Sequence, residues 1–404
     1  MRGLGSWLAL VAWVIGSACG SADSGGARPV SEPTVSPTPA MSPTASATAV
    51  PTPLPSASAG EPAGLAWAVG ERSVLRSDDG GVTWSVARNN FQPNALAFVD
   101  RKDGWIVEAT TDGGHLLHTL DGGRSWQDEI VNLPGPAPLF FDVAVLDARH
   151  AVAVGSENGF IEPDFHRGPP LAVFTSDGGA TWARAALVGV GLGPLGEVAL
   201  GSVCLTTNGA GLAAGTDLVT FAQGLVLLTQ DAGATWKDLT AELPFIPFAR
   251  VACAGDADIW FAGGRSVLLH SADGGATWTD LSANLPDIAI EAVSFHDPLV
   301  GWVAGQDVSP SAASSANRIV AALTTDGGAH WTEKLIVAGV GETTLGMDFL
   351  DAQRGVIVAQ DLHPLQIPRS SFGLTFATAD GGSTWTPTVQ PEPIDALWDV
   401  QLFP

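Results

Sequence analysis

Seven near-identical octapeptides constrain the fold of this 404-residue chain more than any other feature. Each begins with Ser or Thr, has Asp at its third position and Gly at its fifth, and ends on Trp. They are SDDGGVTW from Ser77, TLDGGRSW from Thr119, TSDGGATW from Thr175, TQDAGATW from Thr229, SADGGATW from Ser271, TTDGGAHW from Thr324 and TADGGSTW from Thr378. A segment that recurs at intervals of about forty to fifty-five residues predicts one repeat architecture rather than several unrelated domains.

The chemistry of the octapeptide predicts a hairpin turn. An Asp carboxylate can accept hydrogen bonds from the turn amides, and Gly adopts backbone angles that other residues resist. The seven acids are Asp79, Asp121, Asp177, Asp231, Asp273, Asp326 and Asp380. We interpret them as structural rather than catalytic, because each carboxylate is expected to accept hydrogen bonds within its own turn. The Trp that closes each octapeptide has large apolar faces, which we expect to pack between neighbouring sheets.

Two further strand patterns lie between the octapeptides. One is a Gly-Trp strand such as Gly301–Gly305, and an apolar alternation such as Ala292–Asp297 precedes it. Each repeat therefore predicts four strands, which is one propeller blade. The first repeat begins at its second strand, at Leu65, and its missing innermost strand stands at the C-terminus as Ala396–Phe403. The sequence predicts an all-β, seven-bladed β-propeller of four-stranded blades, closed by the C-terminal strand completing blade 1.

The N-terminal residues predict export. An apolar run, Trp7–Ile15, follows Arg2 and leads into small residues, which is typical of a secretory signal peptide over residues 1–22. The segment ending at Cys19 resembles a bacterial lipobox, in which that cysteine is lipidated. Ordinary cleavage near Ala22 is the alternative, and the sequence leaves both open.

The next segment predicts a tether. Residues 23–63 consist mostly of Pro, Ser, Thr and Ala, a composition that cannot bury a core and stays extended and disordered. The propeller then occupies residues 64–404. We expect an exported protein, at the cell surface or in the periplasm, anchored to the membrane through lipid on Cys19.

Charge restricts the kinds of partner that the protein can bind, and the cysteine content restricts the disulfides that it can form. Asp and Glu number 42 against 18 Lys and Arg, and the resulting net charge of -24 disfavours nucleic acid as a partner. Cys204 and Cys253 stand in corresponding strands of adjacent repeats. A disulfide between them is conceivable, but the expected separation of neighbouring blades favours buried free thiols.

The octapeptide is the Asp-box, or BNR repeat, and together with the Gly-Trp strand it resembles the photosystem II stability and assembly factor family over Gly64–Pro404. This resemblance implies an exported, non-enzymatic propeller that helps to assemble a membrane-protein complex. The arginine-rich patch of that family is not matched here, where Arg167, Arg318 and Arg369 are scattered. Sialidases and xyloglucan hydrolases also carry Asp-boxes, but this chain has no Tyr nucleophile and has residues for one propeller only.

Unequal loops indicate where a partner binds. We expect the loops between second and third strands to lie on the face opposite the octapeptide turns. Four of them carry insertions, near Glu157–Pro170, Thr216–Gly224, Gln306–Arg318 and Gln360–Phe372. Long loops gathered on one face are a common place for binding. The candidate residues are Glu157, Asp164, His166, Arg167, Asp307, Arg318, Asp361 and His363.

Metal binding or catalysis on this face is a weaker interpretation than the binding of a partner protein. Asp164 with His166, and Asp361 with His363, would meet a metal only if their loops converged, and solvated loop residues are the simpler alternative. We therefore predict no metal, no cofactor and no catalytic residue. The predicted function is a monomeric interaction or assembly scaffold for a protein or membrane-protein complex. The alternative is a single-propeller glycan-binding protein or glycoside hydrolase.

Overall fold

The computed structural model describes residues 64–403, apart from 71, 90–91, 110–113, 132, 136, 162–163, 191–197, 218–222, 310–317, 339–341, 362–372 and 390–395. The chain divides into a first unit, Met1–Pro62, and a second, Ala63–Pro404. The predicted signal peptide, Cys19 and the predicted tether therefore lie outside the described residues. Everything below concerns the second unit.

The regular secondary structure of the described chain is almost entirely antiparallel strands in groups of four, with one short 3-10 helix at Ser282–Asn284. The first three groups, each from its inner to its outer strand, are β29 (Leu397–Phe403), β1 (Leu65–Gly70), β2 (Ser73–Ser77) and β3 (Ser85–Asn89); β4 (Pro93–Phe98), β5 (Gly104–Ala109), β6 (Gly114–Thr119) and β7 (Gln127–Ile130); and β8 (Pro138–Val145), β9 (Ala151–Ile161), β10 (Asp164–Thr175) and β11 (Ala183–Arg184).

The remaining strands repeat this arrangement. They are β13 (Val198–Leu205), β14 (Gly211–Asp217), β15 (Gly224–Thr229) and β16 (Thr235–Asp238), with β12 (Ala186–Val188) parallel to β16; β17 (Arg250–Ala254), β18 (Asp258–Arg265), β19 (Val267–Ser271) and β20 (Thr279–Asp280); β21 (Ile288–Phe295), β22 (Gly301–Asp307), β23 (Arg318–Thr324) and β24 (Thr332–Ala338); and β25 (Glu342–Phe349), β26 (Gly355–Asp361), β27 (Gly373–Thr378) and β28 (Thr386–Val389). A short pairing between β18 and β21 joins two of these groups into one eight-stranded sheet.

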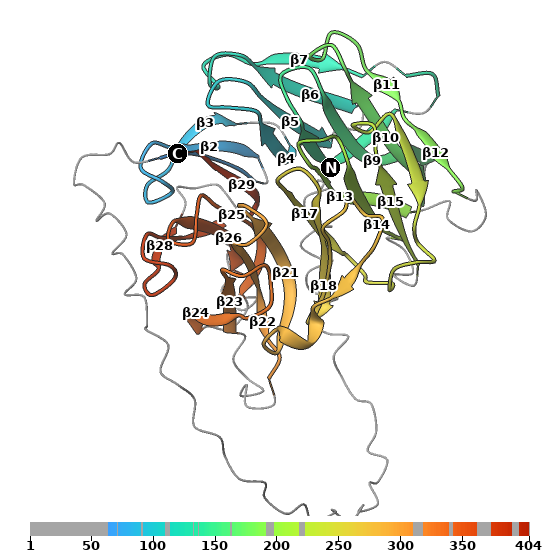
Figure 1. The fold of residues 1–404 in the computed structure, drawn as a ribbon. Helices are drawn as coiled ribbons and strands as arrows, with labels where there is room; N and C mark the ends of the chain where they lie inside the picture. The colour runs from blue at the N-terminus through green and yellow to red at the C-terminus, as the bar shows by residue number, and fades with distance from the viewer. Residues whose placement is uncertain are drawn as a thin grey trace, which may run out of the picture. The chain divides into compact units, whose positions relative to one another are not determined.

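The inner strands follow one another around a closed cycle. In order, β4, β8, β13, β17, β21, β25 and β29 each contact the next, and β29 contacts β4. The C-terminal strand β29 pairs with β1 from Leu65 opposite Phe403 to Gly70 opposite Leu397. In Figure 1 the dark red β29 accordingly lies beside the blue strands at the other end of the described chain. This arrangement confirms the predicted β-propeller of four-stranded sheets and its closure by the C-terminal strand.

Aromatic side chains from consecutive sheets pack against one another. Trp67 of β1 stacks on Phe98 of β4 with ring centroids 5.6 Å apart, and Trp126 meets Trp67 edge-on at 6.2 Å. Between β22 and the group that follows, Trp302 stacks on Phe349 at 4.4 Å and Trp385 meets Trp302 edge-on at 6.2 Å. The tryptophans that close the octapeptides thus reach the neighbouring sheet, as the sequence predicts. Such pairs add about 0.5–1.5 kcal/mol each beyond their buried area.

Candidate functional site

Each octapeptide forms a turn in which the Asp carboxylate is used by the turn itself. In the fifth, Ser271 donates its hydroxyl to Asp273 Oδ1 at 2.8 Å, while Thr277 donates its N–H to Oδ1 at 2.8 Å and its hydroxyl to Oδ2 at 2.6 Å. In the sixth, His330 takes the place of the hydroxyl, with Nδ1 lying 2.6 Å from Asp326 Oδ2. These bonds lower the pKa of Asp273 to about 2 and that of Asp326 to about 2.

The same bonds recur in the other five turns, whose acids are Asp79, Asp121, Asp177, Asp231 and Asp380. A carboxylate that accepts two or three hydrogen bonds within its own turn stays ionised and is a poor general acid at neutral pH. The hydrogen bonds support the structural interpretation of these acids.

The octapeptide turns share one face of the propeller with the loops that join first and second strands. Gly122 donates its N–H to the Lys102 carbonyl at 3.0 Å, and Gly274 donates to the Ala257 carbonyl at 2.9 Å. We call this surface the box face. Because strands alternate in direction, the hairpins between second and third strands lie at the opposite end of each sheet. That opposite surface, which also carries the connections between sheets, is called the loop face.

Among the described parts of the loop-face hairpins, one has paired strands much longer than the others. Strands β9 and β10 have 11 and 12 residues, and their pairing runs from Ala151 opposite Thr175 out to Ile161 opposite Asp164. The inner strand β8 follows β9 only as far as Glu157, opposite Pro138. The predicted insertion at Glu157–Pro170 is therefore not a loop but an extension of the two strands. Its sequence, with Phe160, Ile161 and Phe165, favours strand over coil.

The other predicted binding residues fall into two groups. Glu157 forms an ion pair with Arg184 of β11, and Asp307 accepts a hydrogen bond from Arg318 at 2.7 Å across the base of the β22–β23 hairpin. Bonds from Ser309 and the charge of Arg318 outweigh burial and lower the pKa of Asp307. These contacts fasten hairpins to their own sheets.

The remaining candidates stand on the loop-face hairpins without described side chains. By their backbone, Asp164, His166 and Arg167 belong to β10, and Asp361 ends β26, whereas His363 lies outside the described residues. Within the part of the chain that is described, no group of three or more His, Cys, Asp or Glu is placed to hold a metal ion. Whether the two Asp-x-His pairs meet depends on side chains outside the described residues, so the sequence interpretation of these pairs stays a prediction.

Polar side chains on the inner strands connect each sheet to the next, and the sequence analysis did not identify them. Asp142 Oδ2 accepts the Val203 N–H at 2.7 Å, Asp348 Oδ2 accepts that of Leu402 at 2.8 Å, and Asp399 Oδ2 accepts that of Leu96 at 3.1 Å. Four further contacts complete the cycle: Glu291 with Thr344 N–H, Asn94 with the Phe140 carbonyl, Ser202 with Val251 N–H and Arg250 with the Glu291 carbonyl. We call these seven contacts the inner-ring contacts.

The charged members of this ring converge inside it. Burial raises the pKa of Asp142 and of Asp348 to about 7, with the charge of Asp399 adding to the effect, and burial raises the pKa of Asp399 to about 6. Arg250 on β17 interacts electrostatically with Glu291 on the adjacent β21, and with Asp142 on β8 and Asp399 on β29, which lie farther round the ring. These carboxylates are partly accessible yet surrounded by protein, as expected of groups that line the interior of a propeller.

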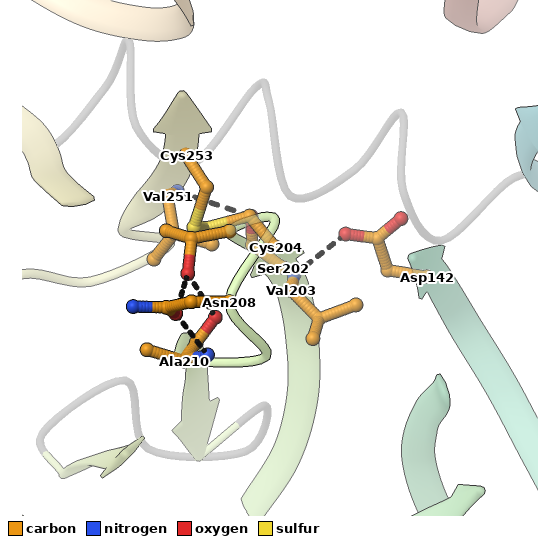
Figure 2. Close-up of a disulfide and its surroundings, with 9 residues drawn as sticks. Asp142, Ser202, Val203, Cys204, Asn208, Ala210, Val251 and Cys253 are labelled. Atoms are coloured by element: carbon orange, nitrogen blue, oxygen red, sulfur yellow. Dashed lines mark hydrogen bonds between the residues drawn. A yellow bond between two sulfur atoms is a disulfide. The ribbon is translucent and has the colours of Figure 1, made fainter. Parts of the chain in front are cut away.

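A disulfide joins Cys204 of β13 to Cys253 of β17, with Cα atoms 5.6 Å apart. Figure 2 shows the sulfur bond between the two strands, with the Ser202 to Val251 hydrogen bond beside it. The prediction of free thiols is therefore wrong. Inner strands approach more closely than outer ones because blades converge toward the centre of a propeller, and here the separation lies within the range that a disulfide spans.

Comparison with known proteins supports the fold. No family model and no curated protein sequence matches this chain. A solved structure of YCF48 bound to a D1 peptide matches with a TM-score of 0.50 at 18% identity, covering 74% of this chain and 86% of that one. The two proteins share a β-propeller fold. YCF48 from Cyanidioschyzon merolae has a TM-score of 0.44 at 17% identity, covering 74% and 84%. The GH74 xyloglucanase of Xanthomonas campestris has 0.39 at 12% identity, covering 81% and 64%.

Among the described residues, no helix is long and apolar enough to cross a membrane.

Proposed function

We propose that this chain is an exported, seven-bladed, non-enzymatic propeller that binds an extracytoplasmic segment of another protein on its loop face. The observation that carries the proposal is the β9–β10 hairpin, whose paired strands run past the end of β8 at Glu157. Beyond Glu157 the hairpin has one partner strand fewer than the rest of the sheet, and strand edges of this kind can pair with an extended peptide.

On the box face, the octapeptide carboxylates are bonded within their own turns. On the loop face, Phe245 in the connection between β16 and β17 is 47% exposed. YCF48, which shares the fold, has been solved with a bound peptide, and peptide binding by this chain is a proposal by analogy. Export and a lipid anchor on Cys19 belong to the same proposal.

Capture from membranes tests the proposal. Residues 158–167 are replaced by Asn-Gly, because Glu157 and Gly168 already lie side by side and a two-residue turn can join them. We expect this variant to melt like the wild type and to lose the proteins that the wild type captures from solubilised membranes of the host. The matched control is Arg124→Glu, an exposed residue of the second octapeptide turn, which we expect to retain capture. Equal capture by all three proteins would contradict a loop-face site.

A further inference from the structure

The Cys204–Cys253 disulfide crosses the boundary between two consecutive sheets. Cys204 stands on β13 and Cys253 on β17, 49 residues apart in sequence, and both side chains are half-buried rather than sealed in the core. A covalent bond here fixes two inner strands to each other within the ring. Its position makes it accessible to small thiol reagents.

The disulfide acts on a short inner strand that hydrogen bonds also hold. Arg250 Nε donates to the Glu291 carbonyl at 3.0 Å, and Thr207 donates its N–H to the Gly255 carbonyl at 3.0 Å. Among the described inner strands β17 is the shortest, with five residues, and an irregular connection over 239–249 precedes it. Within that connection Phe248 has φ 55°, a left-handed conformation that is costly for an aromatic residue. Toward β13, the hydrogen bond from Val251 N–H to Ser202 Oγ is 3.2 Å long, the longest of the seven inner-ring contacts.

We infer that Cys204 and Cys253 form a redox-dependent clasp, which adds a covalent link to the inner ring only after the chain has met a thiol-oxidising system. Two thiols lose two protons and two electrons as the S–S bond forms, and the electrons pass to the disulfide of a donor protein by thiol–disulfide exchange. Such donors operate outside the reducing cytosol. Reduction removes the covalent link between β17 and β13 and leaves the Ser202–Val251 hydrogen bond, whereas the closure between β29 and β1 contains no cysteine and is unaffected.

Melting and hydrogen exchange under two redox conditions test the clasp. The chain carries Cys19→Ala, so that two of its three cysteines remain. We expect a phosphine reductant to lower Tm by about 3–6 °C. Amide exchange should rise in β13 and β17 and stay unchanged in β29 and β1. The control is the double variant Cys204→Ser/Cys253→Ser. It should melt at the Tm of the reduced protein, and its Tm should not change when the reductant is added.

Mass tagging of thiols in cells provides a second measurement, independent of the variants. A thiol-reactive polymer should fail to label the exported protein and should label both cysteines when the leader is deleted and the chain stays in the cytosol. Two labelled thiols in the exported protein would overturn the inference. A reductant that changes neither Tm nor exchange would overturn it as well, even with the disulfide present.

Discussion

At the scale of single residues, the same side chain has opposite roles on the turns and in the ring. The octapeptide acids are ionised and hydrogen-bonded at the surface, whereas Asp142, Asp348 and Asp399 are carboxyls surrounded by protein. Burial raises the pKa of these three, and hydrogen bonds lower the pKa of the turn acids. The two sets therefore respond to pH in opposite directions.

The first prediction concerns pH. The three ring carboxyls have pKa values raised above the ordinary value of about 4, so the native state binds their protons more tightly than the unfolded state does. Their contribution to the free energy of unfolding is therefore lost as pH rises from about 4 to 7. The turn acids, with lowered pKa, lose their contribution as pH falls from about 4 toward 2. We expect Tm to be highest near pH 4, and to fall by at least about 3 °C between pH 5 and pH 8.

Asp142→Asn tests whether a buried ring carboxyl causes this pH dependence of Tm. The amide oxygen still accepts the Val203 N–H but has no ionised form. The Tm at pH 8 should rise, and the difference between pH 5 and pH 8 should shrink. A pH profile identical to that of the wild type would show that the ring carboxyls do not control stability.

The second prediction concerns the turns. Asp273→Ala removes the acceptor for the Ser271 hydroxyl and for both donors of Thr277, so we expect Tm to fall by about 1–3 °C with capture unchanged. Asp78→Ala is the control, because its exposed carboxylate pairs only weakly with Arg76 and should not change Tm. Full stability combined with lost capture would make the turn acid a binding residue instead.

Residue identity alone could predict the turns but not the ring. The octapeptide has short-range chemistry, in which donor and acceptor are at most four residues apart. The ring contacts join residues far apart in sequence, such as Asp399 with Leu96. A signal was present, because Asp142, Asp348 and Asp399 each stand between two large apolar residues of an inner strand. The cysteine prediction failed because it used a general blade spacing, whereas the Cα atoms of Cys204 and Cys253 are 5.6 Å apart.

At the scale of elements, order along the chain predicted pairing well, because turn residues mark where strands end. The inner strand supplied by Ala396–Phe403 is the clearest case, since β29 pairs with β1 as expected. Insertion lengths were less informative. A long segment between two strands can become a loop or can extend the strands, and only the pairing from Glu157 to Gly168 distinguishes the two outcomes.

The third prediction concerns this closing strand. A chain that ends at residue 395 lacks β29, its pairing with β1 and the bonds of Asp399 and Gln401 to β4. We expect it to aggregate or to melt without a cooperative transition. A synthetic peptide of residues 396–404 should restore the transition by adding the missing strand in trans. Cooperative melting of the truncated chain at the wild-type Tm would contradict closure by β29.

At the scale of the whole molecule, the account combines an exported leader, a tether and a propeller. The leader was inferred from composition, and the fourth prediction addresses it: mass spectrometry of the mature protein should find an N-terminus at acylated Cys19. Cys19→Ala should shift the protein from the membrane to the soluble fraction. An unacylated terminus near Asp23 would support ordinary cleavage instead and would leave the propeller assignment untouched.

Site-specific photocrosslinking tests the central claim, that partners meet the loop face, most directly. A photoreactive phenylalanine replaces Phe245 on the loop face or Leu120 on the box face, two apolar residues that are 47% and 63% exposed. Both variants are expressed in the host and irradiated under the same conditions. The account predicts a discrete crosslinked partner from position 245, lost when residues 158–167 are replaced by Asn-Gly, and none from position 120. Crosslinks from position 120 alone would contradict it.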